Sequence, residues 1–283
     1  ILEKGDDNAI VRAVIALAKT MGLKVLAEGV ETQVQLDFLR KENCDMYQGY
    51  LFSRPISPEE LADLAQELGI DGYDLAVRPG HPVNPDNVTT ADTLLAAMAD
   101  AGAPRVKLGY YKIDLNSSYW NQVEATRRHL EGWGELAAKH GVQVVYHTHS
   151  NRCMGLNAGM LMHLLRGLDA SRVGAYLDTG HLVGEGEEFV VATKIAADYL
   201  TCVSLKDFHL HRGEKANHGL KSRDVVEAGL GMVDWTSVFE ELKALDFDGP
   251  ASIHCEFETD DDFLTAVRRE AAFFLAHRQQ AFG

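Results

Sequence analysis

Short apolar runs and helical stripes alternate along most of the chain. The first stripe places Ile10, Val14, Leu17 and Met21 on one face of a helix that ends at Gly22. After it, runs rich in Val, Leu, Ile and Tyr have the length of buried strands, and each ends in polar residues, Gly or Pro. The predicted strands are residues 24–30, 46–52, 73–79, 105–111, 142–149, 173–181, 200–207 and 250–258.

Helical patterns separate the predicted strands, and several begin with Ser, Thr or Asp, which cap helix N-termini. The clearest are residues 32–43, 57–69, 234–246 and 261–280. Alternating strands and helices predict a parallel sheet with right-handed crossovers. No G-x-G-x-x-G or P-loop motif follows a strand. Units of this number and length predict an α/β fold, a single closed (β/α)8 TIM barrel over residues 1–283.

The charge of the chain narrows the partners that we expect. A net charge of −15 and a pI near 5.2 disfavour binding to nucleic acid and to an anionic membrane. The sequence has no apolar stretch of membrane-spanning length and no basic and apolar leader, and its 4 cysteines include no C-x-x-C pair. We therefore expect a cytoplasmic protein with reduced, buried thiols.

Ionisable side chains gather where the predicted strands end. In chain order they are Glu28, Arg78 with His81, His147 with His149, Asp178 with His181, Lys206 with Asp207, and Glu256 with Glu258. The C-terminal ends of barrel strands meet at one rim, which carries the active site in TIM barrels. His147 and His149 are two residues apart, so both imidazoles of a strand point to the same face. The sequence predicts a functional site at this rim.

The N-terminal stretch carries the motifs AEGVET and QGYLFSRP. With them, residues from about 7 to 68 resemble the last part of EAL-type cyclic-di-GMP phosphodiesterase domains, which are (β/α)8 barrels. The resemblance implies that Glu28 and Gln48 are active-site positions. The EAL signature, the metal-binding Asp pair and the catalytic lysine segment of that family are absent from the chain. We therefore expect phosphodiesterase activity to be lost.

The rest of the chain carries the motifs YHTHS, YLDTGHL, VSLKDFH and GLGMVDW. Residues from about 71 to the end resemble the xylose-isomerase-like sugar phosphate isomerases and epimerases, which are also (β/α)8 barrels. The two resemblances together imply one barrel made of two strand–helix units from an EAL-like fragment, residues 1–70, and six from an isomerase-like fragment, residues 71–283. Because the chain begins with Ile1, we expect an engineered chimera rather than a natural recombination.

The second resemblance implies a metal site. Members of that family hold a divalent ion with a Glu, an Asp, a His and a Glu. By resemblance Asp178 and Glu256 occupy two of these positions, His147 stands where many members have Glu, and Ser204 replaces the usual His. We predict His147, Asp178, Glu256 and His181 as ligands of Mn²⁺, Co²⁺, Zn²⁺ or Mg²⁺.

The same resemblance implies a reaction. A metal-dependent isomerase or epimerase removes a proton next to a carbonyl, and the ion stabilises the enediolate that forms. We predict Glu256, Lys206 and His149 as catalytic groups that act on a small carbohydrate-like substrate.

Each of these roles has a structural alternative. The strand-end histidines can be hydrogen-bonded polar residues, Asp178 can cap the next helix, and Lys206 can pair with Glu256 or Asp207. We expect residues 209–219 to form a loop of solvated side chains, although His209 is a possible substitute ligand. For the whole chain the alternative is a chimeric scaffold that folds without efficient catalysis, so enzymatic activity stays open.

Overall fold

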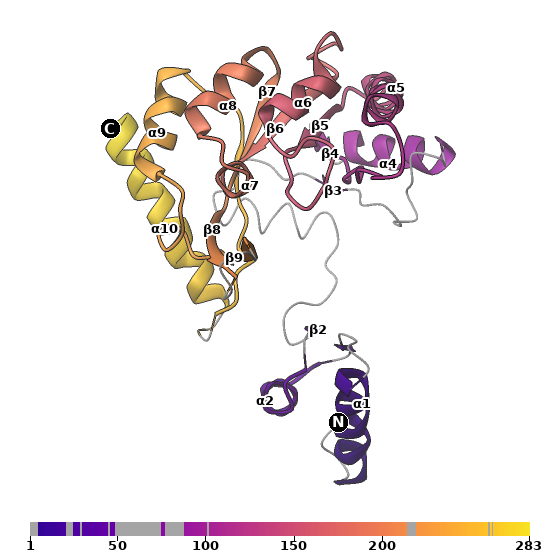
Figure 1. The fold of residues 1–283 in the computed structure, drawn as a ribbon, viewed down its shortest axis with the longest axis vertical. Coiled ribbons are helices and arrows are strands. Elements are labelled where there is room, and N and C mark those ends of the chain that lie inside the picture. Colours follow the sequence, from indigo (N-terminus) through magenta and orange to yellow (C-terminus); the bar gives the residue numbers. More distant parts are fainter. Residues whose placement is uncertain are drawn as a thin grey trace. The chain divides into compact units, whose positions relative to one another are not determined.

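The computed structural model describes residues 5–20, 25–28, 30–44, 46–48, 75–76, 88–100, 102–213, 219–259, 261 and 263–283. The chain divides into two compact units, residues 1–70 and 71–283. Figure 1 traces it from the indigo N-terminus to the yellow C-terminus. Among the described helices, none combines the length and the apolar character that crossing a membrane requires.

The described part of the first unit contains two helices and two short strands. Its described elements are α1 (Gly5–Thr20), β1 (Leu26–Glu28), α2 (Gln33–Lys41) and β2 (Met46–Gln48). β1 and β2 run parallel, with Glu28 opposite Gln48. Ile15 of α1 packs with Leu36 and Leu39 of α2 in a small apolar core. The pattern of helix and strand predicted for this stretch is therefore confirmed where the structure describes it.

The second unit is built on a parallel sheet. Its strands, in order across the sheet, are β3 (Leu75–Ala76), β4 (Arg105–Lys107), β5 (Gln143–His147), β6 (Val173–Asp178), β7 (Leu200–Leu205) and β10 (Ala251–Ile253). Neighbouring parallel strands need a crossover connection, and each of these links contains a helix. Every residue of β6 is buried, as expected for a strand that is covered on both faces.

Helices cover one face of this sheet (Figure 1). They are α4 (Val88–Asp100), α5 (Tyr119–Ala138), α6 (Ala158–Leu165), α8 (Phe189–Ala196), α9 (Trp235–Ala244) and α10 (Phe263–Phe282), with the short α7 (Thr179–Gly184) and the 3-10 turn η1 (Ala197–Tyr199) between them. The longer helices contact one another in chain order. On α5 the buried Val123, Leu130 and Trp133 form the apolar stripe that packs on the sheet.

The predicted strands are confirmed, because each predicted range contains an observed strand of the parallel sheets. Among the described strands, β3 and β10 are the edges of the sheet of the second unit, and β1 and β2 pair with each other. A closed (β/α)8 barrel and a single domain over residues 1–283 therefore stay predictions. The predicted helix 57–69, Arg78 and His81 lie outside the described residues.

An antiparallel ribbon continues from the end of β7. It consists of β8 (Asp207–Arg212) and β9 (Leu220–Val226). The expectation of a loop is therefore wrong over residues 209–212. The sequence of β8, Asp-Phe-His-Leu-His-Arg, alternates polar and apolar positions, which is the pattern of a half-exposed strand.

The buried carboxylate of Asp207 ties this ribbon to the loop that follows it. It accepts hydrogen bonds from the backbone N–H groups of Phe208, Gly229, Gly231, Met232 and Val233 and from the indole of Trp235. Such a set of donors stabilises a buried carboxylate without a cation. Gly231 is required here, because a Cβ would lie 2.1 Å from the Oδ1 of Asp207.

A second buried carboxyl group, that of Glu270 on α10, is only partly satisfied. Its Oε1 accepts the N–H of Ala228 at 3.3 Å, and its Oε2 has no hydrogen-bond partner. Burial raises the pKa of Glu270 to about 7, from an ordinary value of 4.5. The folded protein therefore keeps a proton on this group that the unfolded chain releases at lower pH.

We expect Glu270→Gln to stabilise the protein more at pH 8 than at pH 5. Between pH 4.5 and 7 the folded state binds more protons at Glu270 than the unfolded state, so wild-type stability falls as the pH rises through this window. The amide of the variant does not titrate. Its free energy of unfolding, compared with that of the wild type, therefore rises by about 3 kcal/mol across this window. Urea unfolding at both pH values measures this difference. The exposed Glu240→Gln is the control, and equal effects of Glu270→Gln at both pH values would contradict the prediction.

Candidate functional site

The strands of the second unit send alternate side chains to the face of the sheet opposite the helices, here called the inner face. In β5, Val144 and Tyr146 belong to the core beneath the helices, so Val145 and His147 point to the inner face. Val145 packs there with Tyr176 of β6 and Cys202 of β7. By the same alternation the inner face includes Asp178 and Ser204, and the segment after β10 adds His254.

Asp178 is the most enclosed acidic group of the inner face. It is fully buried at the end of β6, where it also caps α7. Its Oδ1 accepts the N–H of His181 at 2.8 Å, and its own N–H donates to the hydroxyl of Thr148. Its Oδ2 faces away from the helix, toward His147 of β5 and toward His254 in the segment after β10. Capping and a possible ligand role, which were alternatives in the sequence, therefore belong to different oxygens of one side chain.

Three possible ligand atoms converge on the inner face. His147 Nε2, Asp178 Oδ2 and His254 Nδ1 lie within 4.8 Å of one another. The Asp178 oxygen is 3.3 Å from the His147 nitrogen and 3.8 Å from the His254 nitrogen. All three atoms are buried without a hydrogen-bond partner, a condition that is rare in folded proteins. A divalent ion among them would satisfy all three, so these residues, here called the inner cluster, fit a metal site.

A tyrosine hydroxyl contacts the second ring nitrogen of each histidine of the inner cluster and so orients the ring. The Nδ1 of His147 is 3.3 Å from the hydroxyl of Tyr110, and the Nε2 of His254 is 3.3 Å from the hydroxyl of Tyr176. Each contact leaves the other ring nitrogen, the one in the inner cluster, free to present its lone pair. A histidine that binds a metal is held in this way, with its second nitrogen in a hydrogen bond.

The protonation states suit metal binding. Burial lowers the pKa of His147 well below its usual value and lowers the pKa of His254 to about 4. Burial opposes the ionisation of Asp178, but the neighbouring His181, His147 and Lys206 outweigh it and hold the pKa of Asp178 well below its usual range. At neutral pH the inner cluster therefore offers two neutral imidazoles and one carboxylate, which are the forms that bind metal ions.

Lys206, which follows β7, lies between two carboxylates. Its Nζ is 2.9 Å from Glu256 Oε2 and 3.7 Å from Asp178 Oδ2. The hydroxyl of Thr179 bonds to its backbone, and Gly180 permits this close approach, because a Cβ would lie 3.0 Å from the carbonyl oxygen of Lys206. Burial opposes ionisation of Glu256, but Lys206 outweighs it and lowers the pKa of this carboxyl. The side chain of Glu256 is 56% exposed, so an ionised carboxylate faces solvent beside the inner cluster.

Two further histidines border the inner cluster. The Nδ1 of His181 accepts the N–H of Ser150 at 3.3 Å, so the hydrogen of the neutral ring is on Nε2, which is buried without a partner. Burial lowers the pKa of His181 to about 3. The Nδ1 of His149 donates to the carbonyl of Ser150 at 2.9 Å, and the rings of His149 and His181 are 4.1 Å apart. In this tautomer Nε2 of His181 is an N–H donor, and a ligand role for this nitrogen would require the other tautomer.

The predicted site residues lie close together, but one residue was missed. Of the predicted ligands, His147 and Asp178 are in the inner cluster, while Glu256 and His181 border it. The residue that was missed is His254. The sequence did offer a sign of it, because His254 directly follows the apolar end of β10 in the same way that His147 stands at the end of β5. A ligand role for Glu256 or His181 stays a prediction.

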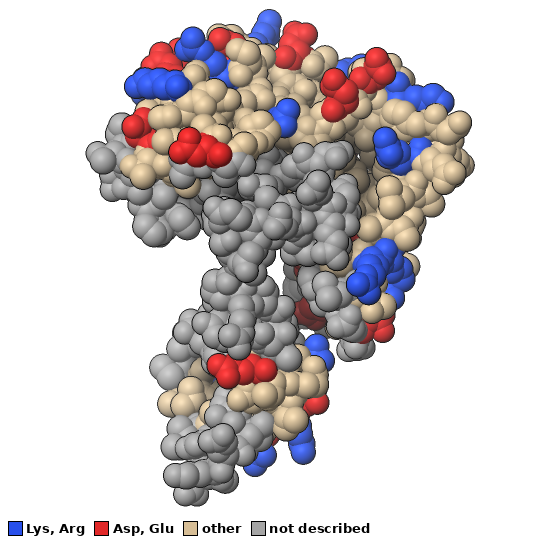
Figure 2. Space-filling model, turned by 180° about the vertical axis from the view of Figure 1, so that it is seen from behind, with Lys and Arg blue, Asp and Glu red and all other residues tan. Residues whose placement is uncertain are grey.

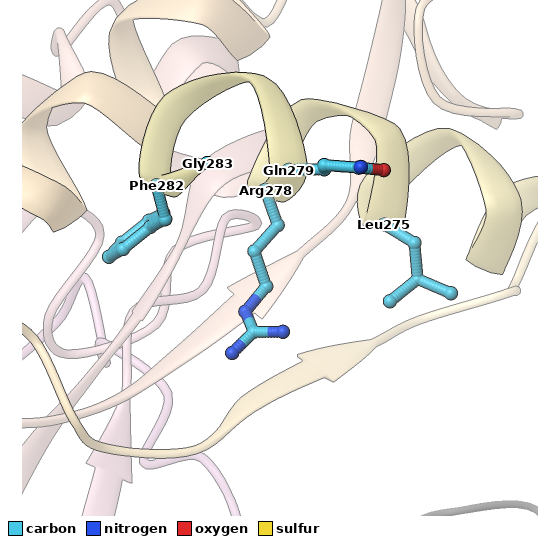
Figure 3. A pocket seen from close by; sticks show the side chains of 5 residues that line it. All are labelled: Leu275, Arg278, Gln279, Phe282 and Gly283. Carbon is cyan, nitrogen blue, oxygen red and sulfur yellow. The ribbon is translucent and has the colours of Figure 1, made fainter.

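Two other features of the described residues lie apart from this site. Basic and acidic side chains are interspersed over the described residues of the face in Figure 2. A hollow of about 390 Å³ lies beside the last turns of α10 (Figure 3). It is lined by Leu275, Arg278, Gln279, Phe282 and Gly283. None of these residues belongs to the inner cluster or borders it.

Comparison with known families accounts for both parts of the chain. Residues 124–277, more than half of its length, match the xylose isomerase-like TIM barrel family. The chain belongs to this family. Residues 1–55 match the EAL domain, so both resemblances seen in the sequence are confirmed.

Curated relatives match the xylose isomerase-like and the EAL part separately. Inosose dehydratase of Geobacillus thermodenitrificans is 30% identical over 127 residues, which are 42% of this chain and 42% of that protein. The bifunctional diguanylate cyclase/cyclic di-GMP phosphodiesterase MucR of Pseudomonas aeruginosa is 50% identical over 56 residues, which are 20% of this chain and 8% of that protein. The chain therefore spans less than half the length of these relatives.

Solved structures share the xylose isomerase-like fold at low sequence identity. The IOLI protein with a bound zinc atom has a TM-score of 0.65 and 15% identity, covering 92% of this chain and 100% of that chain. L-ribulose 3-epimerase has a TM-score of 0.60 and 17% identity, covering 91% and 95%. A xylose isomerase-like protein from Mycobacterium smegmatis in complex with magnesium has a TM-score of 0.58 and 12% identity, covering 97% and 90%. These similarities establish the fold alone.

We expect Zn²⁺ or Mn²⁺ to raise the melting temperature of the metal-free protein, and His254→Ala to lose the greater part of that increase. An ion that binds only the folded state stabilises it by about 2.7 kcal/mol at 100 times its dissociation constant. Thermal unfolding with and without the ion measures the effect. His181→Ala is the matched control beside the inner cluster and should keep the increase. The same increase in all three proteins would contradict the ligand role of His254.

Proposed function

We propose that this chain is a divalent-metal-dependent isomerase or epimerase. It would transfer a proton next to the carbonyl of a small sugar, keto-inositol or sugar phosphate. The observation that carries the proposal is the inner cluster, in which His147, Asp178 and His254 direct three buried, unpartnered ligand atoms toward one another. The family and the fold support the substrate class, because relatives and structural neighbours include an inosose dehydratase and sugar epimerases.

The donor set favours particular metals. Two imidazoles and one carboxylate form a softer set than oxygen ligands alone, which favours Zn²⁺, Co²⁺ or Mn²⁺ over Mg²⁺ and Ca²⁺. When bound, such an ion would supply positive charge beside the substrate oxygens and so stabilise the enediolate formed on proton removal. Structural neighbours solved with zinc and with magnesium support a divalent ion in a protein of this fold.

Glu256 is the group best suited to remove the proton. Its carboxylate is ionised because Lys206 lowers its pKa, and it is open to a substrate from the solvent side. The ammonium group of Lys206, 2.9 Å away, would hold the carboxylate in place and offset negative charge that develops on the substrate. This pair therefore combines a positioned base with a fixed cation.

The bordering histidines would handle hydrogen bonds to the substrate. His181 carries its hydrogen on the unpartnered Nε2, which suits it to donate to a substrate hydroxyl or carbonyl oxygen. His149 donates from Nδ1 to the carbonyl of Ser150, so its Nε2 is the acceptor in the neutral ring. Burial lowers the pKa of His149, which keeps that acceptor available at neutral pH. His149 would thus accept a proton or a hydrogen bond.

The alternative is a chimeric scaffold that folds without efficient catalysis. The observation that favours it is the match of the first 55 residues to a different family from the remainder of the chain. A barrel of mixed origin would lack part of the substrate pocket of either parent. We also propose, from the sequence, that the chain is of engineered origin and that it is cytoplasmic. We propose further that it binds neither nucleic acid nor a membrane.

Removal of the proton next to the substrate carbonyl should depend on Glu256. We expect the metal-loaded protein to exchange the hydrogen next to the carbonyl of at least one ketose, keto-inositol or sugar phosphate with deuterium from solvent, a step that epimerisation and dehydration share. Glu256→Gln should slow this exchange by about 10²- to 10⁴-fold, because it removes the base. The matched control is Glu258→Gln, at an exposed position two residues further on. No exchange above the metal-free blank across the panel would favour the scaffold.

The EAL-like residues should add no phosphodiesterase chemistry. In the described part of the first unit, Glu28 and Gln48 lie opposite each other in the β1–β2 pair, but the chain lacks the signature segments that bind metal in that family. We expect no hydrolysis of cyclic-di-GMP in the presence of Mg²⁺ or Mn²⁺. Chromatography of the nucleotide after incubation measures this, and linear product that increases with enzyme concentration would contradict the prediction.

A further inference from the structure

Ser204 of β7 is a polar residue of the inner face that the proposed proton transfer does not yet use. Val203 and Leu205 belong to the core beneath the helices, so the side chain of Ser204 between them points to the inner face. This side chain is fully buried, and its hydroxyl has no hydrogen-bond partner among the described residues. Buried hydroxyl groups nearly always have a partner, so this state indicates a partner from outside the protein.

The register of the sheet places Ser204 next to the inner cluster. β7 lies between β6 and β10, and Ser204 pairs with Asp178 on one side and with Ser252 on the other. Neighbouring strands are about 4.8 Å apart, so contacts that join β6 to the segment after β10 cross the inner face of β7. One such contact is that of Asp178 Oδ2 with His254 Nδ1, at 3.8 Å. Ser204 and Lys206 flank this contact from β7, and Lys206 Nζ is 3.7 Å from the same oxygen.

Ser204 and Asp178 are paired in register, yet they do not hydrogen-bond to each other. A hydroxyl can donate to a carboxylate, but Ser204 Oγ and Asp178 Oδ2 are each buried without a hydrogen-bond partner among the described residues. Asp178 Oδ2 is turned instead toward the nitrogens of His147 and His254. A group that satisfies both sides must be held by the inner cluster and must accept a hydrogen bond from the hydroxyl. An oxygen atom on a bound metal ion meets both conditions.

The inner cluster leaves a position for such an oxygen. It offers three ligand atoms, and a catalytic zinc site with three protein ligands keeps a further position for a substrate oxygen or water. Lys206, two residues after Ser204, holds Glu256 by a contact of 2.9 Å. An oxygen beside Ser204 would therefore lie on the side of the inner cluster where the proposed base and its cation are.

We propose that Ser204 marks the open coordination position of the inner metal site and donates a hydrogen bond to the carbonyl oxygen of the substrate that enters there. This inference rests on the proposed function. Removal of the neighbouring proton by Glu256 increases the negative charge on that oxygen, and a donor aimed at developing charge stabilises the transition state more than the bound substrate. The substrate must present a free carbonyl, which a keto-inositol always has and a ketose has only in its open-chain form.

A cysteine in place of Ser204 tests this position without substrate. The full chain is freed of metal with a chelator and titrated with Co²⁺, while its absorption is recorded in the near ultraviolet. We expect Ser204→Cys to show a thiolate-to-cobalt charge-transfer band and to bind Zn²⁺ about tenfold more tightly than the wild type, because its thiolate fills the open position. The wild type is the matched control. It has a buried thiol, Cys202, two residues earlier on the same face, and it should bind Co²⁺ without this band.

Loss of the hydroxyl should affect turnover and not metal binding. We expect Ser204→Ala to bind Zn²⁺ with the affinity of the wild type and to slow the exchange of the hydrogen next to the carbonyl by about 10²-fold, mainly through kcat. Ser204→Thr keeps a hydroxyl and should recover most of this rate. Calorimetry measures the binding, and nuclear magnetic resonance of the substrate in deuterium oxide measures the exchange.

The outcomes separate this inference from the proposed function. Cobalt bound by both proteins, with no thiolate band in Ser204→Cys, would overturn the role of Ser204 and leave the inner metal site standing. Exchange by Ser204→Ala at the wild-type rate would overturn that role as well. Absence of cobalt binding in the wild type would instead contradict the inner metal site, on which the proposed function and this inference both depend.

Discussion

The inner face depends on keeping one ionised carboxylate, that of Asp178, fully buried. Moving a carboxylate out of water costs several kcal/mol unless hydrogen bonds and opposite charges replace its hydration. The first turn of α7 supplies one replacement, because the N–H of His181 binds Oδ1. This bond also fixes the rotation of the carboxyl group. Oδ2 is then held where His147, His254 and Lys206 surround it, and the geometry of the inner cluster follows from this.

The parallel sheet brings these groups to Asp178. Neighbouring strands lie about 4.8 Å apart, so side chains on one face at the ends of adjacent strands come within reach of one ion. β5, β6, β7 and β10 are adjacent in that order. Each contributes one group at its end. The side chains of Tyr110 and Tyr176 then turn the imidazoles of His147 and His254 so that a lone pair of each faces the same place.

Lys206 and Asp207, which follow β7, have different roles because adjacent side chains in a strand point to opposite faces of the sheet. Lys206 points to the inner face, where it pairs with Glu256. Asp207 points away from it and binds the backbone of the loop after β9. The sequence left open whether Lys206 pairs with Glu256 or with Asp207. The six donors around Asp207 explain the outcome, since a carboxylate satisfied by N–H groups needs no cation.

The sequence by itself determined the alternation of strands and helices, the two family resemblances, and the placing of His147 and Asp178 at strand ends, because these depend on local apolar runs and on a period of two. It did not determine that His254 joins His147 and Asp178 in the inner cluster. Nor did it determine that one oxygen of Asp178 caps α7 while the other stays free, or that residues 209–212 pair with β9. Those outcomes depend on which atoms of distant strands meet, and only the register of neighbouring strands and the contacts of Tyr110 and Tyr176 decide this.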